Sequence, residues 1–149
     1  MSQSENVPHG EETGATPDGR HAGEALNDNS SPMMGRDICG PTATVKSVAS
    51  LKPENFYAGA LFNLRFDPKS VEGEKGIDTI ESVVKTFFKE GGQHIQINVV
   101  DDATLRAAQE HPEDYRGLVV RVAGYLAYFT ELDRHVQDAL IARTAHGGC

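Results

Sequence analysis

Apolar residues recur at regular intervals only beyond about residue 36 of this 149-residue chain. The residues before that point are polar and rich in Gly, Pro, Asn and Asp, with a turn signal at residues 16–20, TPDGR. A segment of this composition is expected to be disordered when it stands alone. We therefore separate a loop-rich segment, residues 1–30, from a folded domain, residues 31–149, whose periodic pattern begins near Gly40.

Residues 76–92, GIDTIESVVKTFFKEGG, show the most regular helical spacing, and the final Gly-Gly pair is typical of a helix end. Residues 40–51 predict an earlier helix, because Pro41 suits a first turn and apolar residues follow at helical spacing. The predicted buried faces are Ile77, Ile80, Val84, Phe87 and Phe88 on the longer helix, and Val45, Val48 and Leu51 on the shorter one.

Two further helices are predicted nearer the C-terminus. One is capped by Asp101 or Asp102 and runs through Gln109. The other lies within residues 130–144 and has Thr130 as its N-cap. The buried stripe predicted for this last helix consists of Leu132, Val136, Ala139 and Leu140.

Three segments have the pattern of strands. Residues 59–68, GALFNLRFDP, and residues 94–101, HIQINVVD, alternate as half-buried strands do. Residues 118–129, LVVRVAGYLAYF, are almost entirely apolar, which predicts a buried strand. Arg121 and Gly124 are unexpected there, because burying a charge is costly and Gly weakens a strand interior. The predicted fold class is mixed α/β.

The composition argues against several classes of function. A formal net charge of −8, without a Lys- or Arg-rich run, disfavours nucleic-acid binding, and no apolar run approaches the ~18 residues of a membrane span. No signal peptide is recognisable, so a reducing cytoplasm is the simplest location. The six His are scattered, and no metal site is predicted. Cys39 and Cys149 suggest no disulfide framework, and an unreactive side chain is the preferred interpretation of Cys39.

The segment RVAGY, residues 121–125, resembles the glycyl-radical signature of the glycyl radical enzymes, the family of pyruvate formate-lyase. Its flanks, IQINVVDDATLRAAQEHPEDYRGLVV before it and FTELDRHVQDALIARTAH after it, are close to the family pattern in order and spacing. The stretches TGATPDGRHAGEALND and SPMMGRDICGPTA look like the preceding loops of the family. The resemblance extends from about Val7 to His146.

The resemblance implies that Gly124 carries a backbone radical. Removing a Cα hydrogen leaves a centre between an electron-donating amide nitrogen and an electron-withdrawing carbonyl, and a planar centre without a Cβ is delocalised over both. Arg121 is interpreted as a buried clamp that holds the radical loop. The other residues expected to support the loop are Val122, Ala123 and Tyr125. The apolar residues expected to exclude water and oxidants are Val120, Val122, Leu126 and Phe129.

The resemblance also implies a fold and partners. The chain is expected to be the C-terminal part of an α/β barrel, with the radical loop following a buried strand. Residues 1–30 would be the loop-rich end of the barrel region, and residues 31–149 the glycine radical domain. No cofactor is expected to be bound, because an S-adenosylmethionine-dependent iron–sulfur activating enzyme installs the radical. The other expected partners are the remainder of the barrel and a second subunit of the full enzyme.

In the family, the glycyl radical oxidises a cysteine on a separate loop, and neither Cys39 nor Cys149 matches that cysteine. We therefore expect this chain alone to be inactive. It is either the radical-bearing portion of a lyase, dehydratase or decarboxylase, or a free-standing glycyl radical cofactor that repairs a damaged enzyme. The first is favoured, because VPHGEETGATPDGR resembles the middle of the full enzyme's fold. RVAGY with IARTAH is most similar to the glycerol and hydroxyproline dehydratase and arylacetate decarboxylase group, and the substrate stays undetermined.

Overall fold

The alternating segment near residue 60 forms strand β1, Leu61–Phe66, at the centre of a three-stranded sheet of order β2-β1-β5. The computed structural model describes residues 5–52, 56–57 and 59–147. Strand β2, His94–Val99, pairs in parallel with β1 over its whole length, from Leu61↔His94 to Phe66↔Val99. The short strand β5, Ala145–His146, pairs in parallel with the end of β1 and was not predicted.

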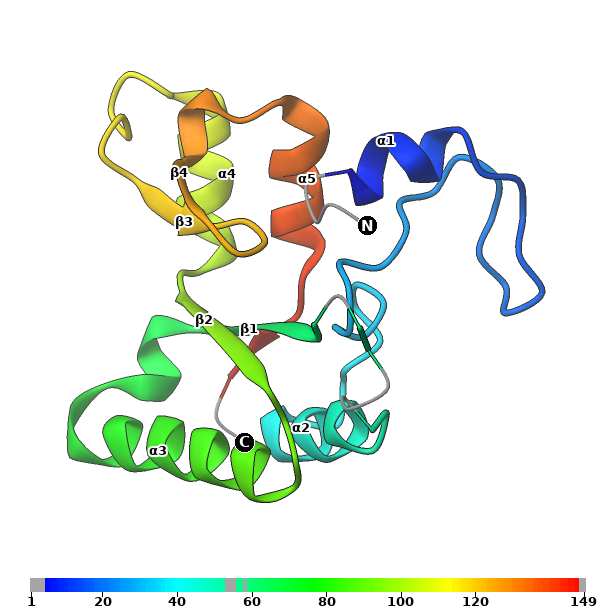
Figure 1. The fold of residues 1–149 in the computed structure, drawn as a ribbon. Coiled ribbons are helices and arrows are strands. Elements are labelled where there is room, and N and C mark those ends of the chain that lie inside the picture. The colour runs from blue at the N-terminus through cyan, green and yellow to red at the C-terminus, as the bar shows by residue number, and fades with distance from the viewer. Residues whose placement is uncertain (1–4, 53–55, 58, 148–149) are drawn as a thin grey trace.

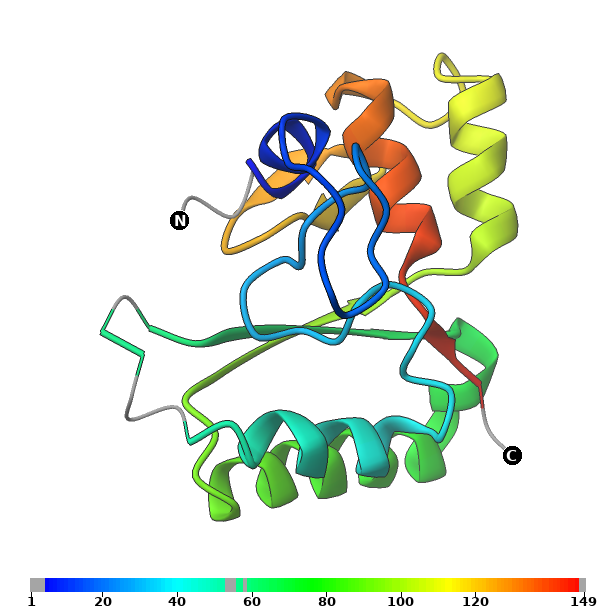
Figure 2. The same cartoon turned by 90° about the vertical axis from the view of Figure 1, so that its right-hand side faces the viewer.

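Helices α2, Pro41–Ala49, and α3, Gly73–Lys89, cover one face of this sheet (Figures 1 and 2). A short 3-10 turn, Pro68–Val71, leads into α3, which makes the crossover between the parallel strands β1 and β2. Apolar side chains of the sheet and both helices form the first core. Its buried members are Val45, Val48, Ala49, Phe62, Leu64, Phe66, Val83 and Phe87.

The buried face of α3 differs from the predicted one. Phe87 is buried as predicted, but Ile77 and Phe88 are 66% and 50% exposed, and Val83, which was not predicted, is buried. A Cβ on Gly76 would lie 2.0 Å from the carbonyl oxygen of Val71, so this glycine lets the helix start pack directly on the preceding turn. That contact fixes the rotation of α3, which hydrophobic spacing alone left uncertain.

The other face of the sheet carries a second layer (Figure 1). It consists of α4, Asp102–Glu110, the hairpin of β3, Val119–Arg121, and β4, Leu126–Tyr128, a 3-10 turn, Phe129–Glu131, and α5, Arg134–Ala142. The buried residues of its separate core are Leu105, Ala108, Val120, Val122, Ala123, Phe129, Leu140 and Ile141.

Two of the predicted helix starts differ in outcome. Asp101 caps α4 as predicted, because its carboxylate accepts a hydrogen bond from the Thr104 N–H at 2.6 Å. The cap of α5 is Asp133, which accepts from the His135 N–H at 2.9 Å, and not Thr130. Thr130 belongs to the 3-10 turn that precedes the helix.

The loop-rich segment contains one helix that the sequence did not predict, α1, Asn6–Glu11. It has no amphipathic period, and its Gly10 lies against the backbone of residues 24–26, where a Cβ would be 2.3 Å from the Glu24 oxygen. Buried Arg20 donates to the carbonyl oxygens of Thr13, Gly14 and Glu24. Hydrogen bonds from polar side chains to the backbone therefore organise this segment, and its disorder when it stands alone stays a prediction.

Candidate functional site

Gly124 lies at the turn of a β-hairpin formed within residues 118–129, in the loop that follows strand β3. Strands β3 and β4 pair antiparallel up to Arg121↔Leu126, and the Val122 N–H donates to the Tyr125 carbonyl at 3.1 Å. Ala123 and Gly124 are then the two residues of the turn. The φ of Gly124 is +97°, in the left-handed region that residues other than glycine rarely adopt.

Polar side chains on one face of β2 form hydrogen bonds with the backbone of this hairpin. Gln96 is 5% exposed, and its Oε1 accepts a hydrogen bond from the Gly124 N–H at 3.0 Å. Two residues further, the Asn98 amide accepts from the Arg121 N–H at 2.9 Å and donates to the Arg121 carbonyl at 2.8 Å. Residues two apart on a strand project from the same face, so both amides reach the hairpin together.

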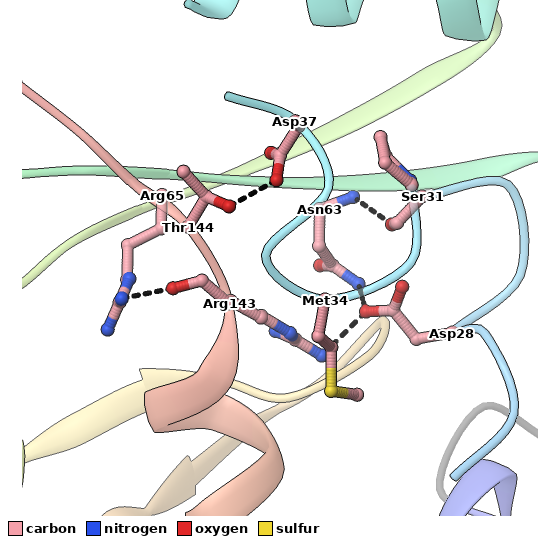
Figure 3. A pocket seen from close by; sticks show the side chains of 9 residues that line it. Asp28, Ser31, Met34, Asp37, Asn63, Arg65, Arg143 and Thr144 are labelled. Carbon is pink, nitrogen blue, oxygen red and sulfur yellow. Dashed lines mark hydrogen bonds and ion pairs between the residues drawn. The ribbon is translucent and has the colours of Figure 1, made fainter. Parts of the chain in front are cut away.

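An arginine whose side chain is 14% exposed holds the other side of the turn. Arg143 follows α5 and donates from Nη2 to the Val122 carbonyl at 2.7 Å, with a longer contact of 3.4 Å from Nη1 to the Arg121 carbonyl. The same Nη2 is 2.6 Å from a carboxylate oxygen of Asp28, which also accepts from the Asn63 side chain at 2.8 Å (Figure 3). These contacts join the hairpin to β1 and to the N-terminal segment.

Burial dominates the electrostatics of Arg143. It lowers the pKa of the Arg143 guanidinium below its usual value; the Asp28 carboxylate raises that pKa only in part, and the nearby charge of Arg65 lowers it further. Arg65 is itself 4% exposed and pairs with Asp102 at 2.7 Å. Each of the two guanidinium groups therefore lies beside a carboxylate, as a charge largely removed from water requires.

The pocket beside these residues encloses about 20 Å³ (Figure 3). Its lining includes Asp28, Asn63, Arg65 and Arg143. This volume corresponds to about one water molecule and is far below the several hundred Å³ of a substrate pocket. In this chain the polar cluster therefore holds the backbone and leaves room for about one water molecule.

The residues predicted to support the radical loop lie in different environments. Val122 and Ala123 are buried, whereas Gly124 is exposed and Tyr125 is 43% exposed. The Arg121 side chain is only partly buried, which corrects its expected burial. Within the described residues no carboxylate pairs with it, and Arg143 makes the contacts expected of the clamp.

The expected apolar shell is only half present in this chain. Val120, Val122 and Phe129 are buried as predicted. Leu126 is 58% exposed, so the prediction that it shields Gly124 is wrong for this chain. The two halves of the hairpin differ in burial. Val120 of β3 and the following Val122 pack into the second core, whereas Leu126 of β4 is exposed.

The holding residues were missed by sequence reasoning, although a signal for them exists. Gln96 and Asn98 are the polar positions of a strand whose alternate residues, Ile95 and Ile97, pack on the first core. Long amides in a strand beneath an apolar hairpin indicate hydrogen bonds to its backbone. Asp28 has no comparable local signal.

The remaining candidate groups do not form a site. Cys39 is exposed in the loop before α2, and Cys149 lies outside the described residues. No cluster of three or more His, Cys, Asp and Glu side chains occurs among residues 5–52, 56–57 and 59–147. Over the same residues, no helix has the length and apolar character needed to span a membrane.

This chain is similar in sequence to known proteins and similar in both sequence and fold to solved structures. Indoleacetate decarboxylase of Tractidigestivibacter scatoligenes is 44% identical over 147 residues, which are 98% of this chain and 17% of that protein. A structure described as 1,2-propanediol dehydration in Roseburia inulinivorans is 50% identical, with a TM-score of 0.91 over 95% of this chain and 18% of that one. The glycerol dehydratase from Clostridium butyricum is 45% identical, with a TM-score of 0.93 over 97% and 18%.

These matches define what this chain shares with its relatives. It spans less than a fifth of their length. The family model described as glycine radical matches residues 26–130, a range that contains Gly124, Gln96, Asn98 and Asp28. Because that range is more than half of the chain, the chain belongs to the glycine radical family.

Proposed function

We propose that this chain is the radical-bearing portion of a glycyl radical enzyme and that Gly124 stores the radical. One observation carries the proposal: within the matched residues 26–130, Gly124 has a positive φ, an exposed position and a backbone held by buried side chains. A hydrogen-atom donor or acceptor needs access to the Cα, and a persistent radical needs a fixed backbone. The hairpin meets both requirements.

The proposed chemistry consists of two hydrogen-atom transfers. An activating enzyme of the S-adenosylmethionine and iron–sulfur class supplies a carbon-centred radical, which takes one hydrogen atom from the Gly124 Cα and leaves an unpaired electron there. In the second transfer, a cysteine thiol gives its hydrogen atom to that Cα, which re-forms the C–H bond and leaves a thiyl radical. Cys39 precedes α2 in a loop and is not assigned to this step, so the thiol is proposed to come from the remainder of the enzyme.

The remainder of the enzyme is also proposed to complete the fold. The parallel strands β2, β1 and β5 would contribute to its α/β barrel, and the exposed Leu126 and Tyr125 would be covered by it. Residues 1–30 would form the loop-rich end of that barrel. A second subunit of the full enzyme and a cytoplasmic location complete this proposal as predictions.

The reaction class is proposed as lyase chemistry without a specified substrate. The three relatives named above are described by three different reactions, at similar identities of 44–50% to this chain. A segment shared at that level by a decarboxylase and two dehydration enzymes fits a common radical store. Substrate selection is then proposed to lie outside this chain.

The alternative function is a free-standing glycyl radical cofactor, which would restore activity to an enzyme whose own radical segment is damaged. Both functions use Gly124 in the same way. They differ in what must be added for turnover: the fragment needs the barrel that belongs to it, and the cofactor accepts the barrel of another enzyme.

Electron paramagnetic resonance tests the radical assignment. The protein is incubated anaerobically with an activating enzyme, and we expect an organic radical signal split by the one remaining α-hydrogen. Gly124→Ala should abolish the signal, because the methyl group crowds the planar centre. Gly117→Ala is the matched control, since Gly117 has no positive φ and open space around its Cβ position. A signal that survives in Gly124→Ala contradicts the assignment.

A further inference from the structure

Gln96 stands out among the residues that hold the hairpin because it bonds Gly124 itself. Asn98 binds the backbone of Arg121, and Arg143 binds carbonyls of Arg121 and Val122. Of the hydrogen bonds within the described residues, only the one from the Gly124 N–H to Gln96 Oε1 joins a side chain to the Gly124 backbone.

The geometry of Gln96 is fixed from β2. The residue pairs with Asn63 across the parallel ladder and is 5% exposed, so neither its backbone nor its side chain has much freedom. Its Nε2 lies 3.4 Å from the His94 ring nitrogen. Because the Gly124 amide is a donor, the group that faces it must be the carboxamide oxygen, which determines the orientation of the amide.

This contact acts on the nitrogen that the radical depends on. In a glycyl radical, the lone pair of the Gly124 nitrogen donates into the half-filled orbital on Cα, which requires the Ala123–Gly124 peptide to be coplanar with that centre. An acceptor on the N–H restrains the peptide plane and draws the proton away from nitrogen, which increases the electron density available for donation.

We propose that Gln96 is a positioning residue for the radical, which sets the orientation of the Ala123–Gly124 peptide and thereby the distribution of the unpaired electron. The proposal rests on the proposed function of Gly124. It assigns Asn98 and Arg143 a different task, which is to hold the chain before the turn at Arg121 and Val122, three and two residues from Gly124.

The test uses the whole protein that contains this chain, labelled with ¹⁵N-glycine and activated anaerobically. Gln96→Leu removes the acceptor at similar size, and Gln96→Met does so with a more flexible side chain should the leucine variant fail to fold. Gln96→Glu keeps an acceptor oxygen at the same place whether or not it is protonated. Gln137→Leu is the matched control, because Gln137 is also a buried carboxamide but binds the Phe129 and Leu132 carbonyls.

We expect two changes in Gln96→Leu and Gln96→Met. The hyperfine couplings of the radical to the remaining α-hydrogen and to the amide ¹⁵N should shift, and before activation the Gly124 amide should exchange with solvent about tenfold faster. Gln96→Glu should restore both values, and Gln137→Leu should leave both unchanged even if it lowers stability.

Two results overturn the inference. Unchanged couplings in both Gln96→Leu and Gln96→Met would show that the contact does not affect the radical, and equal shifts in Gln137→Leu would show a general loss of packing. Failure of the proposed function is distinguishable, since the unsubstituted protein would then give no radical at Gly124 and the role assigned to Gln96 would fall with it.

Discussion

The two faces of the β1–β2 pair differ in the kind of contact they make. One face presents Phe62, Leu64, Ile95 and Ile97 to helices α2 and α3, in a core of apolar side chains. The opposite face carries polar side chains: Gln96 and Asn98 bond the hairpin backbone, Asn63 donates to Asp28, and Arg65 donates to the Ile141 carbonyl at the end of α5. Apolar contact is non-directional, whereas each hydrogen bond selects one backbone group and one angle. The first face therefore stabilises the domain, and the second determines where Gly124 lies.

Removing an aromatic ring from the apolar face should have the largest effect on stability. Phe62 is fully buried, and its ring centroid is 5.5 Å from that of Phe87. Phe62→Ala should lower the free energy of unfolding by about 3–5 kcal/mol, measured by chemical denaturation. Phe88→Ala, at a half-exposed position of α3, should cost less than about 1 kcal/mol. Equal costs would contradict the observed rotation of α3.

Breaking the buried ion pair should come next. Asp28→Asn leaves the Arg143 guanidinium without its carboxylate and should cost about 3 kcal/mol in the same measurement. The exposed pair between Arg134 and Asp138, at 3.6 Å, provides the control, and Asp138→Asn should change stability by less than about 0.5 kcal/mol. If both variants cost the same, the Asp28 contact does not anchor the hairpin.

The contacts of Phe62 with Phe87 and of Asp28 with Arg143 also show which features could be predicted from the sequence. The strands β1 and β2 and helices α2, α3 and α4 were predictable, because hydrophobic period and capping residues are local signals. Gly124 was predictable from a five-residue motif and its flanks. The ion pair of Asp28 and Arg143 that anchors the hairpin was not predictable, because Asp28 lies 115 positions upstream of Arg143 in a segment without periodicity. Only the fold brings them together.

The exposure of part of the apolar segment 118–129 was not predictable for a related reason. This segment is almost entirely apolar, but the chain turns at Gly124, which has a positive φ, and the two halves pair as a hairpin. Composition does not distinguish apolar residues buried within a domain from those exposed on it. Leu126 and Tyr128 are of the second kind in this chain, at 58% and 48% exposure.

A smaller effect is expected at the turn itself. At a φ of +97°, Gly124→Ala should lower the free energy of unfolding by about 1–2 kcal/mol, because a Cβ is strained in the left-handed region. Gly117→Ala should be neutral or slightly stabilising, since its backbone has no positive φ. Thermal or chemical unfolding of both variants measures the difference. Equal stability of the two would place Gly124 in a different backbone conformation.

The smallest expected effect is the loss of stability at acidic pH. Burial raises the pKa of the Asp37 carboxyl, but hydrogen bonds from His146 and Thr144 outweigh it and leave the pKa below the ordinary value. The Thr104 N–H likewise lowers the pKa of Asp101. A lowered folded-state pKa contributes stability above the unfolded value near 4, and that stability is lost as the pH falls through the folded values. The urea concentration at the unfolding midpoint should therefore decrease as the pH is lowered below about 4, and this decrease should be less steep in Asp37→Asn. An equal slope in that variant would contradict the role of Asp37.

The most direct test of the account is the site at which oxygen cuts the activated chain. A carbon-centred radical adds dioxygen, and the resulting peroxyl group leads to cleavage of the backbone at the residue that carried it. After anaerobic activation and exposure to air, mass spectrometry should find a C-terminal piece of this chain that begins near Tyr125. A cut at another glycine, or a cut that persists in Gly124→Ala, would place the radical elsewhere and contradict the central claim.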